Sequence, residues 1–421
     1  MRVVRSVVGV MLILAMLPPS GAAGQSPGTP GGPSASPVPS ATALVEADQG
    51  DDCLAWTRYD ASDLLGEDAV PAAVATLPDG TAVIVGWQEG SASTFRPTAW
   101  VSTDLSTWDA VMLPGGGDYS SAADIAAVDG TVYAVGTRQR PGRKATGLIW
   151  SSSDGRTWSG PESVPAAILA RVTPVDSGVE VAGISQPRPG EPTTPAIWAR
   201  NADADWAASM FGGPGYLDGP FVSSSDGTRL RLASEPGLTD WGSALLHLWR
   251  STDGAAWSEV SLPDDLRSTA FYSVASGPHP DGSGFLLATA AIDGGQGGIW
   301  RSIDGQEWSQ VAESPLVVSA LADGPCGPLA FTSPRVNAKG RFARADALVL
   351  SSHDGATWTT TSVDAFERAA VRDLAMMTDG GAIAVGEQEL VWIGEPDRPA
   401  PEPSSGPTAT GEPATDATAS G

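Results

Sequence analysis

Five aspartates recur along the chain at nearly constant spacing, and such carboxylates can act as general acids, as nucleophiles or as calcium ligands. Each lies two residues after a serine and four residues before a tryptophan. Four of the five motifs read Ser-x-Asp-Gly-x-x-Trp, and the first has Leu105 in place of the glycine. The aspartates are Asp104, Asp154, Asp253, Asp304 and Asp354, and the tryptophans are Trp108, Trp158, Trp257, Trp308 and Trp358.

Turn chemistry explains this motif better than catalysis or calcium binding does, because an active site is seldom built five times over. An aspartate at a turn accepts hydrogen bonds from the backbone N–H groups that follow it, and the serine hydroxyl can act in the same way. Glycine adopts backbone angles that other residues resist, and tryptophan buries a large apolar ring. We therefore interpret the five motifs as structural.

The spacing of the motif is the main architectural signal. With a worn sixth copy that ends at Trp206, the closing tryptophans are separated by 50, 48, 51, 51 and 50 residues. A second tryptophan lies eight residues before the closing one in five of the six copies. A strand-rich repeat of about fifty residues is typical of β-propeller blades.

Each repeat also contains a hairpin signal. Seven Asp-Gly turns or close equivalents, from Asp79-Gly80 to Asp379-Gly380, lie between short apolar runs. Such a dipeptide between apolar segments favours a β-hairpin. One repeat therefore reads as strand a, an Asp-Gly turn, strand b, a variable loop, strand c, the Ser-x-Asp-Gly turn and strand d.

The two ends of the repeat array complement each other. The seventh repeat has Trp392 in the strand c position but no strand d, whereas Trp56 lies 52 residues before Trp108 and matches a strand d without a blade of its own. We predict an all-β, seven-bladed β-propeller of four-stranded antiparallel blades over residues 51–395. The N-terminal strand closes the last blade and leaves no open sheet edge.

The motif resembles the Asp-box (BNR) repeat of sialidases and of many non-enzymatic propellers over this whole region. The usual box, Ser-x-Asp-x-Gly-x-Thr-Trp, is one residue longer between Asp and Trp. The resemblance implies a sialidase-like glycoside hydrolase as an alternative function. Those enzymes need an arginine cluster, an activated tyrosine and an acid. Phe95-Arg96-Pro97 is similar to their Arg-Ile-Pro stretch without its Ile, their other arginines have no match, and they have six blades instead of seven.

Strand alternation places the Asp boxes on one face of the propeller and the b–c and d–a loops on the other. The b–c loops are rich in basic residues, whereas the d–a loops are acidic. One hypothesis is a cationic patch that binds a carboxylated or sulfated glycan, and the other is a solvated face of mixed charge. The candidate ligand-binding residues are Arg96, Arg138, Arg140, Arg143, Arg335 and Arg341.

The two ends of the chain differ in composition from the repeats, and the N-terminal segment predicts export. Arg2 and Arg5 precede a short apolar run and small residues, which is typical of a secretory signal peptide over residues 1–24. Residues 25–50 and 396–421 are rich in Pro, Ser, Gly, Ala and Thr, and we predict disordered linkers there. The apolar run is too short for a permanent membrane span. A net charge of −25 argues against a nucleic-acid partner.

The two cysteines, Cys53 and Cys326, predict one disulfide in an oxidising compartment. Two cysteines and three scattered histidines offer no zinc-type spacing, so we expect no metal and no cofactor. Taken together, the sequence predicts a secreted, monomeric, non-catalytic propeller that binds a protein or an acidic glycan through its b–c and d–a loop face. The alternative is the sialidase-like hydrolase.

Overall fold

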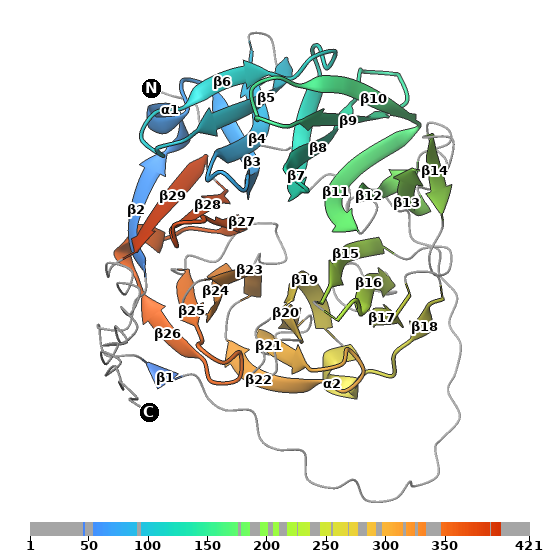
Figure 1. The fold of residues 1–421 in the computed structure, drawn as a ribbon, viewed down its shortest axis with the longest axis vertical. Coiled ribbons are helices and arrows are strands. Elements are labelled where there is room, and N and C mark those ends of the chain that lie inside the picture. The colour runs from blue at the N-terminus through green and yellow to red at the C-terminus, as the bar shows by residue number, and fades with distance from the viewer. Residues whose placement is uncertain are drawn as a thin grey trace, which may run out of the picture. The chain divides into compact units, whose positions relative to one another are not determined.

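The computed structural model describes residues 45–46, 54–90, 94–175, 178–185, 194–200, 205–209, 217–224, 226–235, 245–253, 256–267, 269–276, 284–291, 297–314, 317–324, 327–333, 347–387 and 389–396. The chain divides into two units, Met1–Ser40 and Ala41–Gly421, and every described residue belongs to the second. Its strands form seven sheets, which follow one another around a ring in Figure 1.

Each sheet is one blade, and its strands follow chain order from the centre outward, except that the N-terminal strands β1 and β2 lie at the outer edges of two blades. Blade 1 contains β3 (Ala69–Thr76), β4 (Ala82–Glu89), β5 (Phe95–Ser102) and β6 (Asp109–Met112). Blade 2 contains β7 (Ser120–Val128), β8 (Thr131–Arg138), β9 (Thr146–Ser152) and β10 (Ser159–Pro165). Blade 3 contains β11 (Ala167–Val175), β12 (Gly178–Ser185), β13 (Thr194–Arg200) and β14 (Trp206–Ser209).

Blade 4 contains β15 (Leu217–Ser223), β16 (Arg229–Glu235), β17 (Leu245–Ser251) and β18 (Ser258–Glu259). Blade 5 contains β19 (Thr269–Ser276), β20 (Phe285–Ala291), β21 (Gly297–Ser302) and β22 (Ser309–Ser314). Blade 6 contains β23 (Val317–Gly324), β24 (Gly327–Ser333), β25 (Leu348–Ser351) and β26 (Thr359–Ser362). Blade 7 contains β27 (Val371–Met376), β28 (Ala382–Gly386) and β29 (Leu390–Pro396).

The N-terminal strand β2 (Leu54–Asp60) completes blade 7, and this confirms the predicted closure. It pairs antiparallel with all of β29, from Leu54 opposite Pro396 to Asp60 opposite Leu390. Trp56 packs edge-on against two aromatic rings, those of Phe331 and Phe366, each at a centroid distance of 5.3 Å. The seven-bladed fold therefore has the strand order that the repeats predicted.

One strand was not expected. The two-residue strand β1 (Val45–Glu46) pairs in parallel with Thr359–Thr360 of β26 and gives blade 6 a fifth strand. Three short helices of the described residues lie in connections between blades: α1 (Ala61–Leu64), α2 (Asp264–Arg267) and η3 (Asp364–Phe366). None of the helices in the described residues is long and apolar enough to cross a membrane.

The first strand of every blade faces the centre, and we call these seven strands the inner wall: β3, β7, β11, β15, β19, β23 and β27. Each contacts the first strand of the next blade, all the way around the ring. In the described residues, apolar clusters fill the spaces between most neighbouring blades. The strand c tryptophans Trp100, Trp150 and Trp392 are fully buried there. Trp150 and Trp392 also donate indole hydrogen bonds to the carbonyls of Pro114 and Ala365.

Every inner-wall strand contains a β-bulge where it pairs with strand b. In blades 1, 2, 3 and 7 the residue opposite the bulge is a glycine, and a Cβ there would overlap a carbonyl oxygen of the inner strand or, in blade 7, of the residue just before it. These glycines are Gly86, Gly136, Gly183 and Gly386. A bulge re-aims the side chain that follows it. These four glycines of strand b are therefore required by the bulges.

Candidate functional site

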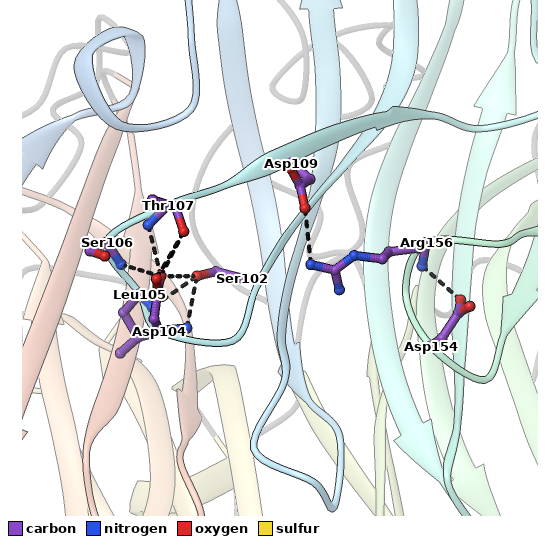
Figure 2. Close-up of polar contacts among 8 residues, drawn as sticks. All are labelled: Ser102, Asp104, Leu105, Ser106, Thr107, Asp109, Asp154 and Arg156. Carbon is purple, nitrogen blue, oxygen red and sulfur yellow. Dashed lines mark hydrogen bonds and ion pairs between the residues drawn. The ribbon is translucent and has the colours of Figure 1, made fainter.

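The Asp-box aspartates are bound within their own turns. Asp154 Oδ1 accepts hydrogen bonds from the backbone N–H groups of Arg156 and Thr157, at 2.8 and 2.6 Å. The Ser152 hydroxyl donates to the same oxygen at 2.9 Å. Figure 2 shows the same arrangement around Asp104, where Leu105 adopts a positive φ of 60° in the position of the missing glycine.

The other boxes repeat this pattern in the described residues. Each aspartate accepts at least one backbone N–H bond through Oδ1, from Ala256 to Asp253, from Gln306 and Glu307 to Asp304, and from Ala356 and Thr357 to Asp354. The N–H of Thr157, first among several such donors, lowers the pKa of Asp154 to about 2. The same kind of bonding lowers the pKa of Asp354 and, more strongly, that of Asp104. Such carboxylates stay ionised and do not suit a general acid.

The box tryptophans are also used in folding. The indoles of Trp108, Trp158, Trp308 and Trp358 each donate to the carbonyl three residues earlier, at 2.6 to 3.3 Å. The Trp257 ring lies under the guanidinium of Arg231, 5.4 Å from its centroid. Arg231 also bonds Glu180 of blade 3 at 2.9 Å. These contacts agree with a structural interpretation of the repeated residues.

The loop-face arginines are only partly brought together. Arg96 forms an ion pair with Asp118 at 3.1 Å, with both side chains about half exposed. Arg138 donates to the carbonyl of Gly115 at 3.4 Å, so both arginines bind the connection between blades 1 and 2. Arg140 and Arg143 lie in an exposed turn of blade 2. Arg335 and Arg341 fall outside the described residues, as do Cys53 and Cys326.

Two aspartates of the inner wall were not identified from the sequence. Asp124 lies on β7 and Asp373 on β27, each directly after the bulge of its strand. Asp124 Oδ2 accepts a hydrogen bond from the Val172 N–H of blade 3 at 2.8 Å. Asp373 Oδ2 accepts the equivalent bond from the Val74 N–H of blade 1 at 2.8 Å. Each aspartate therefore links its blade to the next one in the ring.

The pKa values of these two carboxyl groups are raised, whereas those of the Asp-box carboxyl groups are lowered. Burial, and second the nearby charge of Asp124, raises the pKa of Asp373 to about 7, although the Val74 N–H and Arg171 act in the opposite direction. Burial likewise raises the pKa of Asp124, while Arg171 on β11 lowers it. Asp124 is 7% exposed, and Asp373 is partly buried.

Arginines complete this group. The Arg171 side chain is exposed, and no carboxylate of the described residues lies within ion-pair distance of it. Arg372, next to Asp373, pairs with Glu387 at 3.4 Å. A sequence signal for the group exists: Asp124, Arg171 and Asp373 lie 12 or 13 residues before the glycines Gly136, Gly183 and Gly386. Within the described residues, no three His, Cys, Asp or Glu side chains are arranged to hold a metal ion.

Comparison with known proteins places the chain in a fold but not in a family. No protein-family model matches the sequence, and no curated protein is similar to it. Virginiamycin B lyase from Staphylococcus aureus, solved as a catalytically inactive H270A variant with quinupristin, is 12% identical with a TM-score of 0.54. That match covers 81% of this chain and 99% of the lyase. A structure of YCF48 bound to D1 peptide is 14% identical over 83% of this chain and 98% of YCF48, with a TM-score of 0.52.

At these low identities, the structural matches show a shared β-propeller fold and do not show a shared function. A sialidase from Trypanosoma rangeli and a xyloglucanase from Xanthomonas campestris also match, with TM-scores of 0.41 and 0.38, which are too low to support an argument. The likeness to the Asp-box family therefore stays a resemblance of motif.

Proposed function

We propose that this chain is a secreted, non-catalytic binding module that holds a protein or glycan ligand on its b–c and d–a loop face. The observation that supports this most is that the repeated polar residues and the candidate binding residues differ in their partners and in their location. The repeated Asp-box aspartates are bonded within their own turns, whereas the candidate arginines of blades 1 and 2 lie at the loops of the other face. Loops carried on a rigid scaffold are the usual place for binding.

The structural neighbours support a ligand-binding role by analogy. YCF48 was solved with D1 peptide bound, which makes a protein segment a reasonable ligand class for this chain. The signal-peptide pattern of residues 1–24 supports export. A strongly acidic composition, with a net charge of −25, suits an extracellular protein that must stay soluble.

The hydrolase alternative has less support. Arg96, the one residue with a motif match to sialidases, is engaged by Asp118. A lyase analogy meets a similar difficulty, because the lyase named above is inactive when a histidine is replaced. Of the two described histidines, His247 contacts Glu259 at 2.6 Å between outer strands, and His353 lies in an Asp-box turn. Neither is on the inner wall.

The test is a glycan array and a peptide array, run beside a fluorogenic sialoside assay on the mature protein. We expect binding without turnover. If the ligand is an acidic glycan, the triple variant Arg138→Gln, Arg140→Gln, Arg143→Gln should weaken binding, and salt should weaken it further. The matched control is Arg156→Gln, which removes an arginine paired with Asp109 on the Asp-box side.

The outcomes are distinct. Binding of peptides and not of glycans would identify a protein partner. Sialoside turnover that is lost in Arg96→Ala would overturn the proposal in favour of the hydrolase. An equal loss of binding in the Arg156→Gln control would show that the loop face is not the site.

A further inference from the structure

Blades 7, 1, 2 and 3 are built alike at the inner wall and differ there from the other three. Each has a glycine opposite its bulge, where blade 4 has Ala233 and blades 5 and 6 have Thr289 and Thr332. In ring order, the residues that follow these four bulges are Asp373, Ala73, Asp124 and Arg171. Three of the four are charged, and both signs are present.

The two carboxylates are held in fixed orientations. A backbone N–H of the next blade binds Oδ2 of each at 2.8 Å. Ala73 lies between them in the ring and is buried in the apolar cluster of blades 1 and 2. Asp373 is partly exposed, whereas Asp124 is buried.

Arg171 offers the opposite charge beside them. It acts electrostatically on both aspartates, yet it makes no ion pair with either within 4 Å, and its side chain is exposed. Ala72 and Ala123, the bulge residues of blades 1 and 2, are small and partly exposed. This part of the wall therefore presents an anionic and a cationic group that do not neutralise each other by direct contact.

We infer that the inner wall of blades 7, 1, 2 and 3 binds a ligand that carries an ammonium group and a carboxylate a few ångströms apart, as a free α-amino acid does. Arg171 binds the carboxylate, since a guanidinium matches its two oxygens. Asp373, supported by Asp124, binds the ammonium group. A ligand with only one charge would leave either Arg171 or Asp373 without an oppositely charged partner.

The site should depend on pH, because Asp373 must be ionised to bind an ammonium group. The charged groups that act on it are Asp124 and Arg171, while β3 and β28 carry none and β23 carries Asp323 near its far end. With a pKa of about 7, the ionised fraction of Asp373 rises about tenfold between pH 6 and pH 8. Affinity should rise with it.

The experiment is calorimetry on the mature protein, with glycine, ethylamine and acetate as probes. A capped Lys-Asp dipeptide tests whether a peptide supplies the same pair of charges. The variants are Arg171→Gln and Asp373→Asn, and the asparagine keeps an acceptor for the Val74 N–H. The matched control is Asp323→Asn, another inner-wall aspartate whose pKa is raised by burial, on blade 6.

We expect glycine to bind more tightly than either singly charged probe, and each site variant to lose about tenfold in affinity because a charge-assisted hydrogen bond is lost. Asp323→Asn should leave the affinity unchanged. The rise in affinity from pH 6 to pH 8 should disappear in Asp373→Asn. Tighter binding of the dipeptide, with the same response to the variants, would identify a peptide as the ligand that supplies the ammonium and carboxylate groups.

The inference is overturned if glycine and the dipeptide bind no more tightly than ethylamine and acetate, or if Arg171→Gln and Asp373→Asn behave like the control. This failure is separate from that of the proposed function. Loop-face binding is measured with the array ligand and the Arg138, Arg140 and Arg143 variants, and Asp373→Asn should not change it.

Discussion

Asp154 and Asp373 belong to the same propeller, and their surroundings shift their pKa values in opposite directions. Asp154 is exposed in a turn whose backbone N–H groups lower its pKa to about 2. Asp373 is on the inner wall, where burial and the charge of Asp124 raise its pKa to about 7. The first aspartate has four close relatives in the other boxes, whereas the second has one counterpart, Asp124, among seven blades.

The difference indicates how repetition separates structural from functional residues in this fold. A residue that recurs in every blade solves a problem that every blade has, which here is the backbone of a tight turn. A charged residue that appears in only some blades has no such explanation, and its burial costs free energy unless it is paired. The inner-wall aspartates are therefore the better candidates for function, although the box aspartates are the ones that stand out in the sequence.

The largest expected effect comes from the bulge that aims Asp124. In Gly136→Ala the new Cβ would overlap the carbonyl oxygen of Ser121, so the two strands must separate. We expect a loss of about 2–3 kcal/mol in the free energy of unfolding, as overpacking gives, measured by urea denaturation. Asp124 should then lose its bond to Val172, and the contrast between the two groups of aspartates should weaken.

Gly130→Ala in the neighbouring hairpin turn is the control. It also places alanine on a glycine, at a φ of 74°, but nothing lies within 4 Å of the new Cβ. Gly130→Ala should lower the free energy of unfolding by only about 1–2 kcal/mol, which is the cost of a non-glycine residue in the left-handed conformation. An equal or larger loss in Gly130→Ala would mean that backbone conformation, and not the close approach at the bulge, explains why these four blades share the shape of their inner wall.

The sequence predicted the features that repeat. Seven hairpin turns and the boxes gave the blade number, and Trp56 identified the closing strand, because each is specified by local residues. It did not predict β1, whose two residues carry no pattern. It also missed Asp124 and Asp373, because their spacing of 12 and 13 residues from Gly136 and Gly386 gains meaning only once the bulges are known. Ring closure, which brings the last blade beside the first, is needed to place Asp373 next to Val74.

A second prediction uses pH to separate the inner-wall aspartate from the boxes. The folded pKa of Asp373 lies above its ordinary value, so the folded state binds an extra proton between about pH 4 and pH 7. Stability from this group therefore falls as pH rises through that window. Asp373→Asn removes the effect, and we expect it to be more stable than the wild type by about 1–2 kcal/mol at pH 8, after allowance for solvent screening.

Thermal unfolding between pH 4 and pH 8 measures this difference, with Asp323→Asn as the comparison on another blade. Asp323 is also raised in pKa by burial, but Asp124 is not among the groups that act on it. Its variant should show a smaller change over the same range. If the Asp373→Asn and wild-type stabilities differ by the same amount at pH 4 and at pH 8, folding does not raise the pKa of Asp373.

The smallest expected effect is in a box. Because the folded pKa of Asp154 lies below its ordinary value, its ionised form stabilises the folded state above about pH 4, and this contribution is lost as the pH falls toward 2. Asp154→Asn keeps an oxygen acceptor but loses the charge, so it should cost about 1 kcal/mol or less at pH 7, since the turn is exposed. The cost should shrink as the pH falls through about 2, which acid titration of the thermal midpoint measures. Asp154→Asn and Asp373→Asn would then both differ from the wild type near pH 7 to 8, with opposite sign, and both differences would shrink as the pH falls. A loss in Asp154→Asn that persisted unchanged at pH 2 would show that the box depends on the shape of the aspartate and not on its charge.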